Sequence, residues 1–152
     1  GFVFKIMTAA SVTVIVFFSF FEDIYLEYLG ALTYLHLDEL KWTGAGLLFI
    51  SLILTIIAQY QMSNSWRIGI DYEEKTALVN EGIFKLSRNP VFLGVLLIYL
   101  GTFLIAPNAI TLTLFVLCYF ILQIQTRLEE EYLESIHGQD YIEYKKKVRR
   151  WI

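Results

Sequence analysis

Long apolar runs separated by blocks of charged residues are the feature that most limits how this chain can fold. Hydrophobic residues make up 57% of the 152 positions, which is more than the roughly half that is usual for a soluble domain. Charged residues make up 18% of the chain, and apart from Lys5 near the start of the first run they lie between the apolar runs. The sequence therefore predicts an all-α, polytopic membrane protein with a single domain over residues 1–152.

Four apolar segments are candidates for membrane spans. We place them at about residues 2–21, 43–62, 91–106 and 109–125. The last two are each short of the roughly twenty residues of a full crossing, so they borrow flanking residues or cross a locally thin membrane. Pro107 and Asn108 separate them and predict a helical hairpin. Gly44 and Gly46, in the second span, indicate close contact between helices.

Basic residues are distributed unevenly between the two sides that a four-span topology defines. Of the 12 Lys and Arg residues, all but Lys41 lie near the N-terminus, in the loop over residues 63–89 or in the tail that follows residue 125. Cytoplasmic segments of membrane proteins carry an excess of Lys and Arg. We therefore expect the 63–90 loop and the C-terminal tail to face the cytoplasm, where they can meet.

The segment over residues 76–94 places polar residues, glycines and a proline at the mouth of the third apolar run. Asn89 is a good N-cap and Pro90 suits a first helical turn, so a helix is predicted to begin there, at the membrane surface. The free backbone N–H groups of such a helix start attract anions, including a carboxylate or a phosphate. An ordinary capped transmembrane helix is the alternative interpretation.

The tail over residues 126–152 is charged and amphipathic, and we expect it to form a cytoplasmic C-terminal helix. If the fourth span continues into it, Gln125 and Glu129 share one helical face and Arg127 points to roughly the opposite side. A carboxylate beside aromatic side chains at the membrane surface suits a cationic ligand. The alternative is that the acidic and basic runs of the tail are only solvated, with the basic residues near anionic lipid.

Other chemistries lack their sequence signatures. His36 and His137 have no His or Cys partners at metal-ligand spacing, so we expect no metal site. Cys118 lies within an apolar run and is interpreted as a small buried hydrophobe. No nucleophile motif or Walker-type loop occurs, and no nucleic-acid partner is expected. What remains is a ligand site built from helix ends and aromatic residues on the cytoplasmic face.

Two motifs resemble those of the isoprenylcysteine carboxyl methyltransferase and phospholipid methyltransferase superfamily. The first is Leu78-Val79-x-x-Gly82-x-Phe84-x-x-Ser87-Arg88-Asn89-Pro90-x-Phe92-x-Gly94, and the second is Glu129-Glu130-x-x-Leu133-x-x-x-x-Gly138-x-x-Tyr141-x-x-Tyr144-x-x-x-Val148. They flank the helical hairpin in the family's order, and the resemblance covers roughly residues 76–151. Two motifs in the right order are a specific signal, whereas a single Arg-Asn-Pro is not.

The resemblance implies an integral membrane methyltransferase that uses S-adenosylmethionine and a lipophilic or lipidated acceptor from the bilayer. Carried over by position, it places the cofactor region at residues 76–94 and 125–150. It implies cofactor contacts at Thr76, Ala77, Leu78, Val79, Phe84, Asn89, Pro90, Val91, Phe92 and Glu129. A sulfonium methyl group is already activated, so its transfer needs alignment and exclusion of water more than a protein nucleophile.

The chain departs from the family pattern on the acceptor side. Gln125 stands where the carboxyl methyltransferases have an Arg implicated in substrate binding, and Arg127 is nearby but on another helical face. Family His and Tyr positions are also substituted, at Thr76, Asn89, Phe84 and Phe92. The acceptor therefore stays open between a prenylcysteine-like carboxylate, a phospholipid amine, an isoprenoid and a small thiol. A membrane scaffold or binding protein that kept the fold and lost turnover is the alternative of another class.

Overall fold

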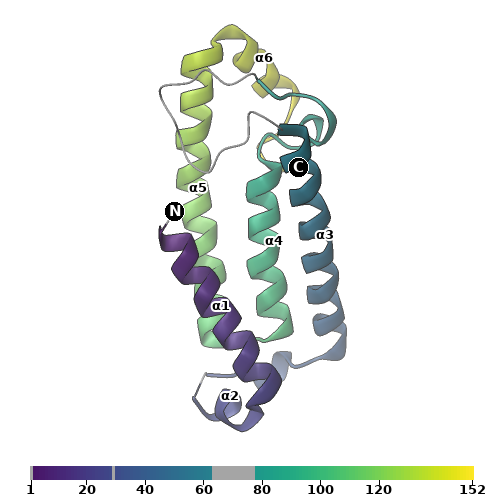
Figure 1. Ribbon diagram of the computed structural model, residues 1–152, viewed down its shortest axis with the longest axis vertical. Coiled ribbons are helices and arrows are strands. Elements are labelled where there is room, and N and C mark those ends of the chain that lie inside the picture. The colour runs from purple at the N-terminus through teal and green to yellow at the C-terminus, as the bar shows by residue number, and fades with distance from the viewer. Residues whose placement is uncertain (1, 29, 63–77) are drawn as a thin grey trace.

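The computed structural model describes residues 2–28, 30–62 and 78–152 (Figure 1). Its helices are α1 (Phe2–Phe20), α2 (Glu22–Tyr28), α3 (Asp38–Met62), α4 (Pro90–Ile105), α5 (Ala109–His137) and α6 (Gln139–Lys147), with the 3-10 helices η1 (Thr33–Leu35) and η3 (Gly82–Lys85). Extended pairing within these residues is limited to an isolated bridge between Ala31 and Asn108. The predicted all-α class is confirmed.

Helices α4 and α5 form the predicted antiparallel hairpin around Pro107 and Asn108 (Figure 1). Asn108 Oδ1 accepts hydrogen bonds from the backbone N–H groups of Ile110 at 2.8 Å and Thr111 at 2.9 Å. In return, Thr111 Oγ1 accepts from the Asn108 backbone N–H at 3.2 Å. This reciprocal capping satisfies helix-start donors and explains why α5 begins directly after Asn108.

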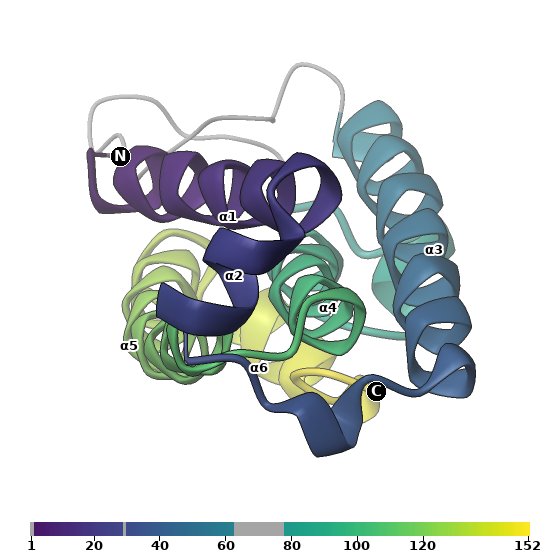
Figure 2. The same ribbon diagram turned by 90° about the horizontal axis from the view of Figure 1, so that it is seen from below.

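Helix α3 packs against α4 through small residues (Figure 2). The buried residues of α3 are Gly44, Ser51 and Ala58, which recur every seven positions and therefore share one face. Ser51 Oγ donates to the Gly94 carbonyl at 2.7 Å, and a Cβ on Gly44 would lie 2.7 Å from the Gly101 carbonyl oxygen. Backbones approach this closely only where side chains are small. The close helix contact expected at Gly44 is confirmed, and the one expected at Gly46 is wrong, because a Cβ there would meet nothing within 4 Å.

Two helices extend beyond the predicted spans. Helix α3 begins at Asp38 and not near residue 43, because acidic side chains in its first turn are favourable at the positive end of a helix. Helix α5 continues unbroken past residue 125 to His137, so the first part of the predicted tail helix belongs to α5. Gly138, with φ 52°, separates α5 from α6, in a backbone conformation that favours glycine.

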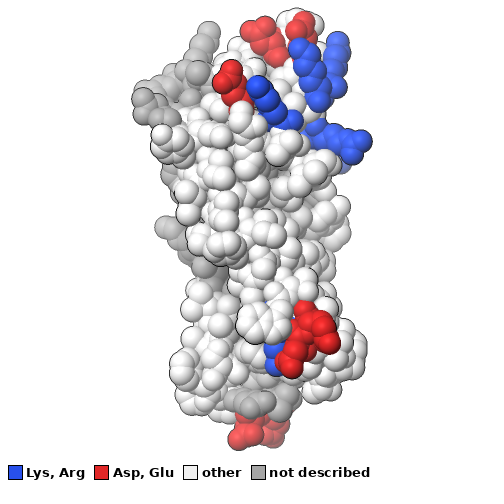
Figure 3. Space-filling view, turned by 90° about the vertical axis from the view of Figure 1, so that its right-hand side faces the viewer, with Lys and Arg blue, Asp and Glu red and all other residues white. Residues whose placement is uncertain are grey.

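The distribution of exposed side chains suits a lipid environment. By length and composition, α3 with 25 residues and α5 with 29 residues could cross a membrane; the apolar stretches Ala9–Phe20 and Pro90–Ile105 are shorter. Large apolar side chains are exposed along the middle of α3 and α5. On the face in Figure 3, charged residues gather at the two ends and leave a belt of other residues between them. Such extensive apolar exposure marks a membrane or interaction surface.

Replacing Gly44 with alanine should destabilise the bundle, because the new Cβ would clash with the Gly101 carbonyl 2.7 Å away. We expect a loss of about 1–3 kcal/mol, measured as the unfolding free energy in detergent. Gly46→Ala is the matched control, since a Cβ there meets nothing within 4 Å and both variants gain the same helix propensity. Equal stability of the two variants would contradict the packing described here.

Candidate functional site

A buried carboxylate in the C-terminal half of α5 contacts both the start of α4 and the C-terminal end of the chain. Glu130 on α5 is 3% exposed. Its Oε1 accepts from Arg88 Nη2 at 2.9 Å, and its Oε2 accepts from Arg150 Nη2 at 2.7 Å. Asn89 Nδ2 also lies 3.5 Å from Glu130 Oε1. We name Arg88, Asn89, Glu130 and Arg150 the Glu130 cluster; its two guanidinium groups and one carboxylate leave an excess of positive charge.

Arg88 also holds the C-terminal segment, residues 148–151, against the start of α4. Its Nη1 donates to the carbonyls of Lys145 at 3.0 Å and Val148 at 2.9 Å, where α6 ends. Its backbone N–H donates to the Arg149 carbonyl at 3.0 Å, and Ser87 Oγ donates to the Arg150 carbonyl at 3.2 Å. Carbonyls at a helix end lack partners within the helix. Arg88 therefore satisfies backbone groups and a buried charge together.

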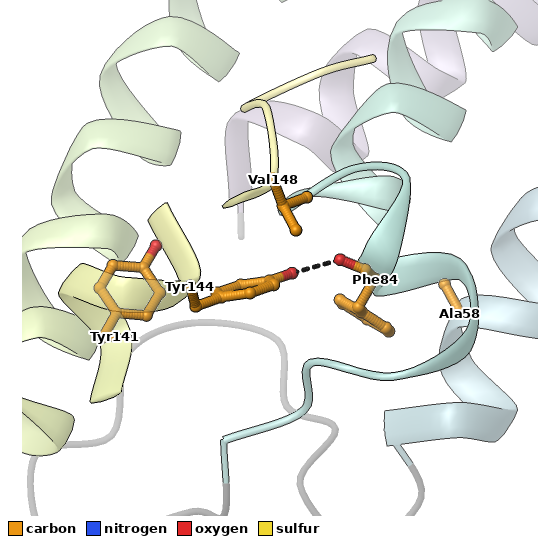
Figure 4. Packing of buried hydrophobic residues seen from close by; sticks show 5 residues of the cluster. All are labelled: Ala58, Phe84, Tyr141, Tyr144 and Val148. Atoms are coloured by element: carbon orange, nitrogen blue, oxygen red, sulfur yellow. Dashed lines mark hydrogen bonds between the residues drawn. The ribbon is translucent and has the colours of Figure 1, made fainter. Parts of the chain in front are cut away.

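An aromatic cluster holds the chain before α4 against α6 (Figure 4). Phe84, Tyr141 and Tyr144 are all buried within it. Tyr144 Oη donates to the Phe84 carbonyl at 2.6 Å, and burial raises the pKa of Tyr144 to about 12. The neutral hydroxyl is the form that donates this bond. Segments 78–86 and 141–148 are thus joined by both apolar contact and a hydrogen bond.

The structure brings most of the predicted cofactor residues to this same end of the bundle. Of the predicted residues, Phe84 belongs to the aromatic cluster, and Leu78, Val79 and Val91 pack against it. Phe92 packs instead on a neighbouring cluster around Tyr99 and Leu122, and Pro90 is fully buried at the start of α4. The predicted contacts Thr76 and Ala77 lie outside the described residues.

The start of α4 differs from the prediction in one respect. Asn89 occupies the N-cap position, but its side chain makes no capping hydrogen bond. Its Nδ2 instead donates to Glu130 Oε1 and to the Arg150 carbonyl, the latter at 3.4 Å. In this orientation its Oδ1, the atom that would accept a capping bond, makes none with the helix N–H groups. In the described structure, the backbone N–H groups of Val91 and Phe92 consequently have no hydrogen-bond partner. Free N–H groups at a helix start favour an anion, and the anion site that the sequence suggests here stays a prediction.

The three residues of α5 that were predicted to contact a ligand differ in their exposure. Gln125 and Glu129 are half-buried, whereas Arg127 is exposed on another face. Within the described residues, the Glu129 carboxylate makes no hydrogen bond or ion pair, in contrast to the neighbouring Glu130. An unpartnered, half-buried carboxylate can bind a cationic or hydroxyl-bearing group. Gln125 and Glu129 are therefore available for a ligand, and Arg127 is not placed beside them.

The sequence pattern gave Arg88, Glu130 and Arg150 no individual role. A signal for Glu130 was nevertheless present, because Cys118, Leu122, Thr126 and Glu130 recur every four residues and are all buried. An acidic residue at the end of such a stripe needs a cationic partner. Arg150 is separated from it in sequence and could not be paired with it from spacing alone. In the structure, hydrogen bonding to Glu130 raises the pKa of Arg150.

Comparison with known proteins places the chain in a family. A sequence profile described as phospholipid methyltransferase matches residues 40–140. The chain belongs to the phospholipid methyltransferase family. It is 35% identical over 77 residues to the protein-S-isoprenylcysteine O-methyltransferase of Saccharomyces cerevisiae, covering 50% of this chain and 32% of that protein. It is 28% identical over 130 residues to protein-S-isoprenylcysteine O-methyltransferase B of Arabidopsis thaliana, covering 81% of this chain and 66% of that protein.

The fold is also similar to a solved structure, that of the eukaryotic intramembrane Ras methyltransferase ICMT (isoprenylcysteine carboxyl methyltransferase). The TM-score is 0.74 with 23% sequence identity, and the match covers 93% of this chain and 50% of the other. At this identity the likeness shows the fold alone. The chain spans less than two thirds of the length of each of these three relatives.

Glu130→Gln should destabilise the protein strongly, because it leaves two guanidinium groups without their buried counter-charge. Breaking a buried ion pair on one side costs about 3–5 kcal/mol, which unfolding in detergent would measure. Glu131→Gln is the control, since Glu131 is exposed and substitutions at such positions change stability by about 0.5 kcal/mol or less. Equal effects of the two variants would show that the Glu130 cluster does not hold these segments.

Alkaline pH should weaken the aromatic cluster. The folded-state pKa of Tyr144, about 12, lies above the ordinary value of 10.0. The hydroxyl therefore contributes stability that is complete below pH 10 and is lost as pH rises through 12. We expect the melting temperature to fall more steeply across this window in the wild type than in Tyr144→Phe. Phe in place of the exposed Tyr60 should leave the wild-type slope unchanged.

Proposed function

We propose that this protein is an integral membrane methyltransferase that transfers a methyl group from S-adenosylmethionine to a lipophilic acceptor. The observation that carries the proposal is the uncapped start of α4 at the same end of the bundle as the unpartnered Glu129, in a chain of the phospholipid methyltransferase family. The relatives in yeast and Arabidopsis are named as O-methyltransferases, which supports the reaction type. A scaffold that kept the fold without turnover is the competing proposal.

The residues at this end of the bundle fit the methyl donor. Its amino-acid carboxylate suits the free N–H groups and excess positive charge at the start of α4. Its cationic or hydroxyl-bearing parts suit the Glu129 carboxylate. Apolar contacts are available from Phe84 and Phe92, which pack in the two adjoining clusters. When bound, the cofactor supplies an activated methyl group, and the protein's task is to align the reactants and exclude water.

The apolar side chains next to this polar end of the bundle support a lipophilic acceptor. Phe92 leads into an apolar cluster with Tyr99 and Leu122, and the outward faces of the helices are apolar. Both curated relatives are named for a protein-bound isoprenylcysteine. Gln125 is half-buried and carries no charge to bind an acceptor carboxylate. The missing charge at Gln125 favours acceptors without a carboxylate, and a phospholipid amine, a small thiol and an isoprenoid are the alternative candidates.

We further propose that α1, α3, α4 and α5 all span the membrane, with the 63–90 loop and the C-terminal tail in the cytoplasm. Trp42 and Tyr60 of α3 are 78% and 84% exposed and stand about 27 Å apart along the helix axis. That separation is close to the roughly 30 Å of a hydrocarbon core, and such aromatic residues prefer its two interfaces. The distribution of basic residues supports the orientation.

Calorimetry of S-adenosylmethionine binding to the detergent-purified protein tests the proposal. We expect micromolar-range binding by the wild type and at least tenfold weaker binding by Glu129→Ala, about 1.4 kcal/mol, because the ligand loses its carboxylate partner. Asn89→Ala should also weaken binding. Arg127→Ala is the control, since Arg127 is exposed away from the site. Absence of binding by folded wild-type protein would refute the methyltransferase and favour the scaffold.

Turnover needs a separate measurement. Transfer of a labelled methyl group from S-adenosylmethionine to a membrane lipid extract, or to an S-prenylcysteine, would identify the acceptor class. Binding without transfer to either would favour a binding protein over an enzyme.

A further inference from the structure

One buried hydroxyl next to the site has no partner. Thr126 is 0% exposed, and its Oγ1 makes no hydrogen bond. Two other helical threonines donate to the carbonyl four residues earlier: Thr43 to Glu39 at 2.7 Å and Thr113 to Ala109 at 2.7 Å. A buried polar group left unpaired costs about 1–3 kcal/mol, and its presence in a native structure calls for an explanation.

Thr126 stands level with the first turn of α4. Ile105 and Ala109 are the helix ends next to the hairpin turn. At 1.5 Å per residue, Pro90 lies about 22 Å from Ile105 along α4, and Thr126 lies about 26 Å from Ala109 along α5. Because the two helices run side by side from one turn (Figure 1), these positions lie at nearly the same height. The orphan hydroxyl is therefore beside the start of α4 and not elsewhere along the bundle.

Thr126 is also on the face of α5 that meets α4. Leu122 and Glu130 lie one turn before and after it on the same helical face. Leu122 packs in the cluster of Tyr99 from α4, and Glu130 Oε1 lies 3.5 Å from Asn89 Nδ2 at the start of α4. A side chain between two residues that both contact α4 is directed into the α4–α5 interface. Burial of Thr126 agrees with this placement.

Three hydrogen-bond donors are thus unused at a similar height of the α4–α5 pair: the Thr126 hydroxyl and the backbone N–H groups of Val91 and Phe92. The Glu130 cluster adds an excess of positive charge, because its single carboxylate is paired with two guanidinium groups. Donors that converge at a helix start with positive charge are complementary to a carboxylate.

We propose that Thr126 Oγ–H, together with the N–H groups of Val91 and Phe92, binds the amino-acid carboxylate of the methyl donor. The inference rests on the proposed function and deepens it, since it names a residue and the end of the ligand that it binds. Gln125 and Glu129, on the adjacent face of α5, are left for the remainder of the ligand and for the acceptor.

The test compares Thr126→Val, which keeps the side-chain volume, with Thr126→Ser, which keeps the hydroxyl. Calorimetry uses two probes: S-adenosylhomocysteine, which carries the amino-acid end, and 5′-methylthioadenosine, which lacks it. Thr126→Val should bind the first probe at least tenfold more weakly and the second unchanged, while Thr126→Ser binds both as the wild type does. Thermal unfolding of the ligand-free Thr126→Val variant should show equal or higher stability, because an orphan polar group has been removed.

Ser11→Ala is the control, because Ser11 Oγ is also buried without a partner but lies on α1. It should bind both probes as the wild type does. Undiminished binding of S-adenosylhomocysteine by Thr126→Val, or equal weakening for both probes, would overturn the assignment and leave the methyltransferase standing. Absence of binding by the wild type would instead refute the proposed function itself, so the two failures are distinguishable.

Discussion

The rest of the site depends on the pairing of Glu130 with Arg88 and Arg150. These residues come from three segments far apart in sequence, and a carboxylate that is 3% exposed is stable only with close counter-charges. Arg88 extends the pairing to the backbone at the end of α6. The C-terminal segment is therefore held beside the start of α4, and the polar end of the bundle becomes one structure.

That pairing also decides the character of the helix start. Asn89 would ordinarily cap α4, but its amide faces the Glu130 carboxylate and leaves the first N–H groups open. Two adjacent acidic residues consequently have different roles, since Glu130 is paired and Glu129 is available. Two neighbouring carboxylates can have such different surroundings because consecutive helical residues differ by about 100° around the axis.

Packing between α3 and α4 supports this end from the other side. Small residues let the two backbones approach, and Ile83 before α4 donates its N–H to Gln61 Oε1 at 2.8 Å, near the end of α3. The sequence indicated the contact at Gly44 because small residues in apolar segments are typical of helix interfaces. It did not reveal that Gly46 faces open space, since the face that a residue presents depends on the partner helix.

By itself, the sequence determined the all-α class, the hairpin at Pro107 and Asn108 and the family, because apolar length, turn residues and motif order are local properties of the chain. Tertiary structure alone decided the continuous α5, the partners of Glu130 and the orphan hydroxyl of Thr126. These depend on which distant groups compete for a buried side chain. The orientation of the Asn89 side chain, for example, is set by its contacts with Glu130 and the Arg150 carbonyl, so a local rule such as N-capping does not predict it.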